Sequence, residues 1–139
     1  MSMQARLAVG IPIVLAIGGL SFAAQGVAPT VDSVVAARLS TARDAFKAID
    51  QMREAGQHLE ASKLYLWSRR LMEVERDAAT TKTERMGAVK AHVDRMEKLL
   101  KDSRLQLEHA EVSRLDHLDI QFHYHEAVSW WVKEREKGK

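Results

Sequence analysis

The sequence contains no cysteine, only two prolines and few aromatic residues (three Trp, two Tyr and three Phe) among its 139 positions. The lack of cysteine excludes disulfide bridges, thiolate metal sites, thiol catalysis and lipids attached through cysteine. The 21 basic and 19 acidic residues leave a formal net charge of +2, so no global charge favours nucleic acid, and we expect no nucleic-acid partner. No proline follows Pro29, which leaves the rest of the chain free to form long helices.

The first 23 residues have the composition of a secretory leader. Arg6 is the only charged residue before Asp32, and an apolar run over residues 7–24 follows it. Small side chains occupy the −3 and −1 positions of a cut after Ala23. We therefore expect residues 1–23 to be a signal peptide and the chain to be periplasmic or secreted. The alternative is an uncleaved anchor in the inner membrane, formed by residues 7–24, because this run has the length of a short span.

The chain after the leader divides into a linker over residues 24–30, a helical domain over residues 31–136 and a frayed tail over residues 137–139. At the start of the helical domain, apolar residues recur every three or four positions, which is the period of one helix face. Gly56 follows this run and predicts the end of a first helix of about 25 residues. The apolar face of this helix consists of Val31, Val35, Leu39, Ala42, Phe46, Ile49 and Met52.

Two further apolar runs with the same spacing are separated by residues 80–84, which contain neither proline nor glycine. Thr81 and Glu84 have the spacing of a capping box, which would begin a new helix there. However, the eight residues from Ala78 to Met86 keep the apolar face nearly in phase. We expect one long helix over residues 58–108 and keep the capping box as the alternative. The two runs are Leu64, Trp67, Leu71, Val74 and Ala78, then Met86, Val89, Val93, Met96 and Leu100.

A last helix is predicted from Ser113, because its hydroxyl can accept from backbone amides while Asp116 returns the bond. We expect an all-α fold: an elongated antiparallel coiled coil, or helical hairpin, in which two shorter helices fold on one long central helix. Such a thin rod buries little surface, so we expect self-association or a protein partner through the helix faces. The expected apolar face of the last helix is Leu115, Leu118, Phe122, Val128 and Trp131.

A shift of 54 residues along the chain aligns residues 54–57 with residues 108–111. Each aligned unit is a turn followed by a helix with heptad patterning, which is the form of an internal repeat. The identical pairs are Glu54 and Glu108, Leu64 and Leu118, and Val74 and Val128.

The segment over residues 107–118 resembles the helix-entry repeat of the outer-membrane efflux protein family, in which a glycine, a serine and an aspartate precede a long coiled-coil helix. Ala110 stands near the position of the family's glycine, and the family's tyrosine is missing. The resemblance covers residues 55–135 and implies the soluble helical-hairpin element of such proteins, because 139 residues leave no room for the family's transmembrane strands. It implies an accessory subunit of an efflux or secretion assembly. The residues that fit the pattern are Val112, Ser113, Asp116 and Leu118.

The six histidines are the only candidates for site chemistry. Asp119, His123 and Glu126 share one helix face and suggest a histidine-and-carboxylate metal-binding protein as an alternative function. Because the chain contains no Glu-x-x-His or His-x-x-x-His, we assign no metal ligand and no cofactor. The polar cluster of the last helix comprises His117, His123, His125, Asp116, Asp119 and Glu126.

Aromatic residues suggest packing rather than a ligand site. Trp67 lies on the apolar face and is expected in the core, whereas Trp130 and Trp131 are consecutive, so that one of them is expected at a contact surface. No nucleophile elbow, phosphate loop, dinucleotide fingerprint or zinc motif occurs, so we expect no catalytic residues and no enzyme. The sequence predicts an exported, non-catalytic helical protein that is a structural or partner-binding element of the cell envelope. It would contact a membrane only if the leader is retained.

Overall fold

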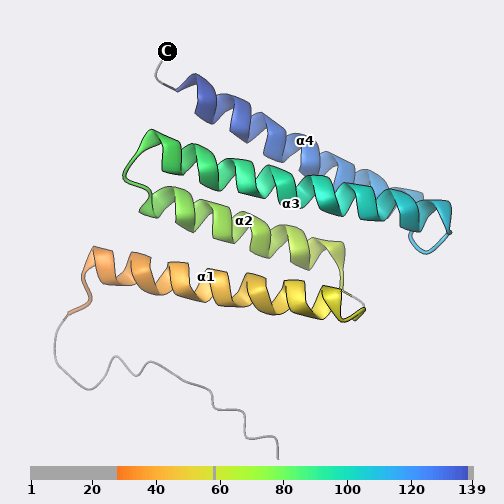
Figure 1. Cartoon of the computed structure of the whole chain (residues 1–139), viewed down its shortest axis with the longest axis horizontal. Coiled ribbons are helices and arrows are strands. Elements are labelled where there is room, and N and C mark those ends of the chain that lie inside the picture. The colour runs from red at the N-terminus through yellow and green to blue at the C-terminus, as the bar shows by residue number, and fades with distance from the viewer. Residues whose placement is uncertain (1–27, 58, 138–139) are drawn as a thin grey trace, which may run out of the picture.

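The computed structural model describes residues 28–57 and 59–137, and the expected leader lies outside these ranges. In the described residues the chain forms helices and no strand, which confirms the predicted all-α class. Figure 1 shows the helices stacked side by side in chain order. They are α1 (Val31–Glu54), α2 (Ala61–Ala78), α3 (Lys82–Glu108) and α4 (Arg114–Glu136).

The long helix predicted over residues 58–108 is wrong, because the chain turns at residues 79–81 and divides it into α2 and α3. Thr81 Oγ1 accepts from the amide of Glu84 at 3.2 Å. In return, Glu84 Oε2 accepts from the amides of Thr80 and Thr81 at 2.8 and 2.9 Å. These bonds satisfy amides that an uninterrupted helix would direct to carbonyls. The capping box therefore outweighs the continuity of the apolar pattern.

The other helix ends follow the prediction. A Ser113–Asp116 capping box starts α4, and α1 ends just before Gly56. Gly56 and Ala110 both have left-handed backbones, with φ of 71° and 58°. After each, the next amide returns to the carbonyl five residues earlier: Gln57 to Met52 and Glu111 to Gln106. Both turns are therefore Schellman motifs.

The two turns make the 54-residue repeat a structural one. One turn joins α1 to α2 and the other joins α3 to α4, so each unit is an antiparallel helical hairpin. Moved by 54 residues, α1 falls on α3 and α2 falls on α4 within a few residues. The chain is thus two similar hairpins, with α2 packed against α3 between them.

The core lies mainly between α2, α3 and α4. Met72 and Val89 are each 1% exposed, and Met96 is 2% exposed. In contrast, α1 contributes one fully buried residue, Ala42, and its backbone packs against α2 alone. Its link to α3 consists of side chains: Arg53 pairs with Asp102 at 3.1 Å. As a result, α1 is the least buried helix of the stack.

The apolar face predicted for α4 is only half correct. Val128 and Trp131 pack against the core as expected. However, Leu115, Leu118 and Phe122 are 75%, 46% and 64% exposed. The buried face is instead formed by residues with a regular 4, 3, 4 spacing, namely Ile120, Tyr124, Ala127 and Trp131.

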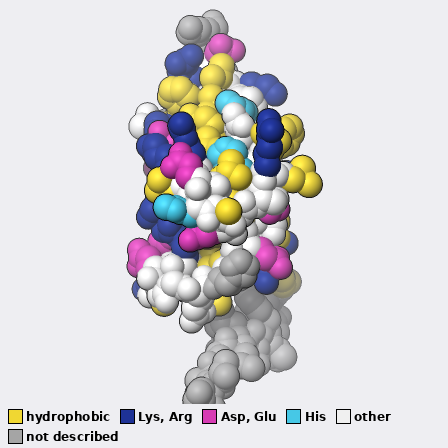
Figure 2. Space-filling view, turned by 90° about the vertical axis from the view of Figure 1, so that its right-hand side faces the viewer, with side chains coloured by type: hydrophobic (Ala, Val, Ile, Leu, Met, Phe, Trp, Pro, Cys, Tyr) yellow, Lys and Arg dark blue, Asp and Glu magenta, His cyan; other side chains and the backbone are white. Residues whose placement is uncertain are grey.

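The outer surface mixes apolar and charged side chains. Seen from the end that carries the α1–α2 and α3–α4 turns, apolar side chains reach the surface among histidines and charged groups (Figure 2). None of the helices in the described ranges combines the length and the apolar character that a membrane span requires.

Candidate functional site

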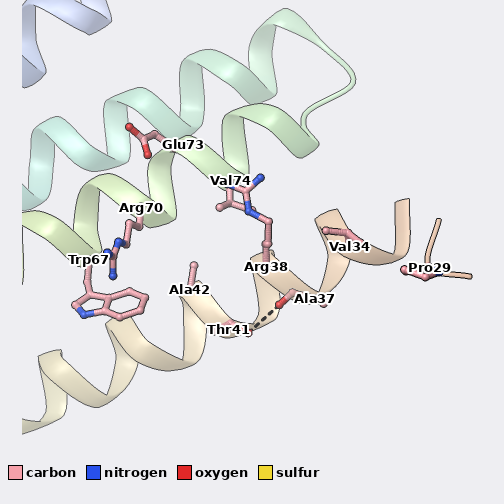
Figure 3. Close-up of a pocket in the computed structure, with 10 residues that line it drawn as sticks. All are labelled: Pro29, Val34, Ala37, Arg38, Thr41, Ala42, Trp67, Arg70, Glu73 and Val74. Atoms are coloured by element: carbon pink, nitrogen blue, oxygen red, sulfur yellow. Dashed lines mark hydrogen bonds between the residues drawn. The ribbon is translucent and has the colours of Figure 1, made fainter. Parts of the chain in front are cut away.

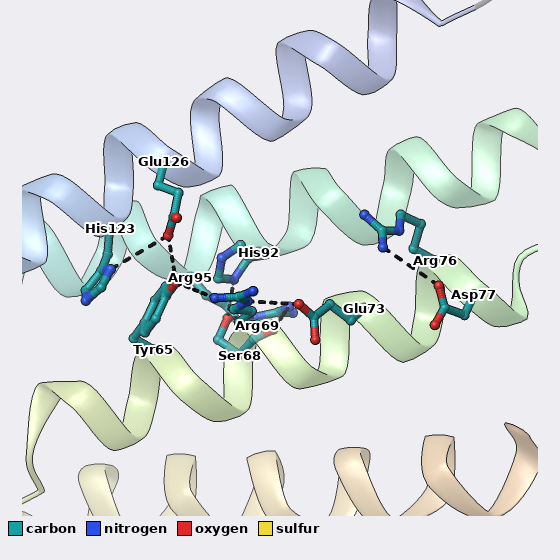
Figure 4. Close-up of polar contacts among 10 residues, drawn as sticks. All are labelled: Tyr65, Ser68, Arg69, Glu73, Arg76, Asp77, His92, Arg95, His123 and Glu126. Atoms are coloured by element: carbon teal, nitrogen blue, oxygen red, sulfur yellow. Dashed lines mark hydrogen bonds and ion pairs between the residues drawn. The ribbon is translucent and has the colours of Figure 1, made fainter. Parts of the chain in front are cut away.

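A buried polar group joins α2 to α3 in the centre of the molecule (Figure 4). Ser68 Oγ lies 2.8 Å from His92 Nδ1. Arg95 Nε donates to Ser68 Oγ at 2.7 Å, and a second guanidinium nitrogen donates to the Ser68 carbonyl at 3.3 Å. Because the hydroxyl accepts from Arg95, its own proton is available to His92 Nδ1, which leaves the imidazole proton on Nε2.

The environment of His92 keeps the imidazole neutral. Burial, followed by repulsion from the cations Arg95 and Arg69, lowers the pKa of His92 to about 3. Its Nε2 atom has no hydrogen-bond partner among the described residues. The ring instead stacks near Trp130, with centroids 5.7 Å apart.

A serine bonded to a neutral histidine has the composition of a nucleophile and its base. Here the side chains of Ser68 and His92 are both 0% exposed, so neither atom can touch a substrate. In addition, the Ser68 hydroxyl oxygen already accepts a hydrogen bond from Arg95 Nε. The arrangement joins two helices and provides no surface for chemistry.

A second polar group lies between α2 and α4. Tyr65 donates its phenol proton to Glu126 at 2.6 Å, and its ring stacks on His123 with centroids 3.6 Å apart. Burial and then the bond to Glu126 raise the pKa of Tyr65. On the same face, Arg69 bonds Glu73 at 2.8 Å and lies 5.2 Å from the centre of the Trp130 ring.

The histidine cluster predicted on α4 is divided by the structure. His123 lies between Asp119 and Glu126, at 3.5 and 3.8 Å, so these three residues do share a face. His117 faces α3 and bonds Ser103 Oγ at 2.9 Å. No group of three or more histidine or acidic side chains that could hold a metal occurs in the described ranges. The metal-binding alternative therefore gains no support from the geometry.

The tryptophans differ from their predicted places. Trp67 is half-buried rather than enclosed in the core, and it lines a groove. Trp130 and Trp131 are both half-buried. Trp130 lies near His92, whereas Trp131 packs against the core residues Val93, Met96 and Ala127.

A groove of about 650 Å³ lies between α1 and α2 (Figure 3), and we call it the α1–α2 groove. Its α1 wall carries small side chains opposite the larger Trp67 and Val74 of α2. Small residues cannot fill the space between two helix axes, so the pair stays open on this side. The lining residues are Pro29, Val34, Ala37, Arg38, Thr41, Ala42, Trp67, Arg70, Glu73 and Val74.

Two arginines border this apolar floor. Arg38 extends from α1 toward Val74, and Arg70 lies with Trp67 at the other end (Figure 3). The Arg70 guanidinium carbon is 4.7 Å from the centre of the Trp67 ring. No carboxylate among the described residues lies within ion-pair distance of Arg38 or Arg70. The acidic lining residue Glu73 is itself bonded to Arg69 at 2.8 Å. The guanidinium groups of Arg38 and Arg70 can therefore meet a negative charge on a ligand whose apolar face covers the floor of the groove.

Sequence reasoning missed both the buried Ser68–His92 pair and the groove. A signal for the first exists, because His92 lies between Val89 and Val93 on the buried face of α3. The groove depends on which faces of α1 and α2 meet, and no local pattern contains that information. A comparison of the chain with family models, with curated proteins and with solved structures finds no match.

Proposed function

We propose that the chain is an exported, non-catalytic helical protein that serves as a structural or partner-binding element of the cell envelope. Its partner would bind in the α1–α2 groove. The open groove carries this proposal: about 650 Å³ of space with an apolar floor remains at the surface of the described residues. An apolar concave surface that the described part of the chain leaves uncovered is typical of a binding site.

Export is the part of the proposal that rests on the leader, residues 1–23. The helical domain contributes the binding surface, and the buried Ser68–His92 pair gives a substrate no access to its hydroxyl. Coiled-coil-like packing would then be made with the partner, whose helix would lie in the groove between α1 and α2.

The groove can be tested with a photoreactive amino acid at Thr41, which is exposed and lines it. In cells that express the full-length chain, we expect light to crosslink Thr41 to a protein of the cell envelope. The matched control is the same amino acid at Ala36, which is exposed on α1 but does not line the groove.

Filling the groove provides the second arm of this experiment. Ala37→Trp places an indole in the groove and should abolish the Thr41 crosslink, while Ala36→Trp should preserve it. The proposal fails if Thr41 and Ala36 give the same products, or if Ala37→Trp leaves the crosslink intact in a protein with unchanged helical circular dichroism.

A place in an efflux or secretion assembly is a second candidate. The observation that favours it is the repeated hairpin, because both turns are Schellman motifs and the second is followed by the serine cap of the efflux-like segment. The Thr41 crosslink also tests this candidate. A transport protein among the crosslinked partners would support it, and an envelope protein with no transport role would contradict it.

A further inference from the structure

We infer that the α1–α2 groove binds helix α4 of a second copy of this chain, so that the protein assembles head to tail. This inference rests on the proposed function, because it names the occupant of the same groove. Two surfaces of one chain carry it: the groove, and the exposed stripe of α4 formed by Leu115, Leu118 and Phe122.

The stripe on α4 is an apolar face that no other helix in residues 28–57 and 59–137 covers. Its three side chains are spaced by three and four positions, so they lie on one side of the helix. This side is opposite the buried face that contains Ile120 and Ala127. Because the chain leaves all three side chains exposed, they do not contribute to its own core.

The two surfaces match in length. From Val34 to Ala42 the groove follows nine residues of α1, whose eight rises of about 1.5 Å make about 12 Å of helix axis. The stripe runs over eight residues from Leu115 to Phe122, whose seven rises make about 10 Å. A helix carrying two turns of apolar side chains therefore covers the floor of the groove.

The two surfaces also match in charge. Arg38 and Arg70 border the groove without a carboxylate partner in the described residues. Asp119 lies beside the stripe and is 58% exposed, and among the described residues its ion-pair partner is the imidazole of His123, at 3.5 Å. Docking would give the arginines a carboxylate while the apolar side chains enter the groove.

The geometry makes the contact heterologous, because groove and stripe are different surfaces on different helices. Each copy would use its groove for one neighbour and its stripe for another, which produces a ring of molecules if the rotation between copies closes and an open chain if it does not. A self-assembling element of this kind would be structural in the sense of the proposed function.

Analytical ultracentrifugation tests the inference on protein purified from cells that express the full-length chain. Two variants each disable one of the two surfaces. Ala37→Trp fills the groove and keeps the stripe, whereas Phe122→Asp spoils the stripe and keeps the groove. We expect the unmodified protein to form dimers and larger species with rising concentration, and each variant alone to remain monomeric. A mixture of the two variants should form a 1:1 dimer that grows no further, since one intact contact remains.

The controls carry similar changes elsewhere. Ala36→Trp and Leu105→Asp alter exposed residues that belong to neither surface, and both should associate like the unmodified protein. Charge reversal provides a further test, because it changes the charge at the border of the groove without filling the groove. The double variant Arg38→Glu with Arg70→Glu should weaken association at least tenfold. Adding Asp119→Arg to that chain should restore most of the lost affinity.

Several results would overturn the inference. The first is a monomer at all concentrations, and the second is a mixture of Ala37→Trp and Phe122→Asp that stays monomeric. The third is a dimer that Phe122→Asp abolishes but that survives both Ala37→Trp and the double arginine variant, because such a dimer would be a symmetric α4–α4 contact. A monomer that still shows the Thr41 crosslink to another envelope protein would contradict self-assembly alone. If the protein shows neither self-association nor the Thr41 crosslink, the proposed function is contradicted as well.

Discussion

His92 shows how one buried side chain links packing to pH. The neutral ring is enclosed beside Ser68 and Trp130, and burial lowers its pKa to about 3. In an unfolded chain the same imidazole titrates near its reference pKa of about 6.5. Acid therefore protonates the unfolded state first, so His92 stabilises the fold fully above pH 6.5 and progressively less as the pH falls toward 3.

We expect the free energy of unfolding to fall by about 2 kcal/mol between pH 7 and pH 5 because of His92. Urea denaturation at a series of pH values measures this dependence. His92→Phe keeps an aromatic ring next to Trp130 and removes the titrating group. Its pH dependence should be flatter than that of the unmodified protein over this range, whatever its absolute stability. Parallel curves for the two proteins would show that the ring titrates normally in the folded state.

At the scale of helices, the two hairpin turns show that local chemistry decides where elements end. Gly56 and Ala110 occupy equivalent places in two Schellman turns, and both have positive φ. An L-residue pays about 1–2 kcal/mol in the left-handed region, whereas glycine does not. Nothing lies within 4 Å of a Cβ built on Gly56, so the backbone alone distinguishes the two residues there.

Exchange of these two residues should therefore shift stability in opposite directions. Ala110→Gly should raise the free energy of unfolding by about 1 kcal/mol, and Gly56→Ala should lower it by about the same amount. Chemical denaturation of each variant measures the change, and the double variant should lie near the unmodified protein. A loss of stability in Ala110→Gly would mean that its methyl group makes a contact worth more than the strain.

The same turns explain which features of the fold were predictable. Caps such as Ser113 with Asp116 depend on a few neighbouring residues, so the ends of α1 and α4 were predicted correctly. The turn between α2 and α3 was predicted as helix because the apolar period continues through it. There the capping box of Thr81 and Glu84 starts a new helix. The apolar residues on either side of it can be buried equally well by one long helix or by two helices that pack against each other.

The candidate site could not be predicted in the same way. Helix α4 carries two apolar stripes, and which of them is buried depends on its neighbours. On α4 the residues Ile120 and Ala127 are buried, whereas Phe122 stays outside. The groove likewise exists because the small residues Ala37 and Ala42 of α1 line it together with Trp67 of α2. Such pairings are properties of the packed molecule and cannot be read from the sequence of either segment alone.

For the whole molecule, the stack has a firm centre and a loosely held edge. Of all the helices, α1 buries the least, with Ala42 as its single fully buried residue, and it packs its backbone only on α2. Its other attachments are side-chain contacts, such as Arg53 with Asp102 and Phe46 beneath the Arg95 guanidinium. Local opening of such an edge costs less free energy than global unfolding.

Native-state hydrogen exchange should therefore show α1 amides opening at a lower free energy than those of α3. Phe46→Ala removes a ring that α1 places against Arg95, so it should lower the opening free energy of α1 by about 1–3 kcal/mol and leave α3 and α4 nearly unchanged. Equal protection of α1 and α3 would mean that the four helices unfold as one unit. Because the α1–α2 groove lies on this edge, its occupation should also slow the exchange of α1 as protein concentration rises, whereas in Ala37→Trp protection should not depend on concentration.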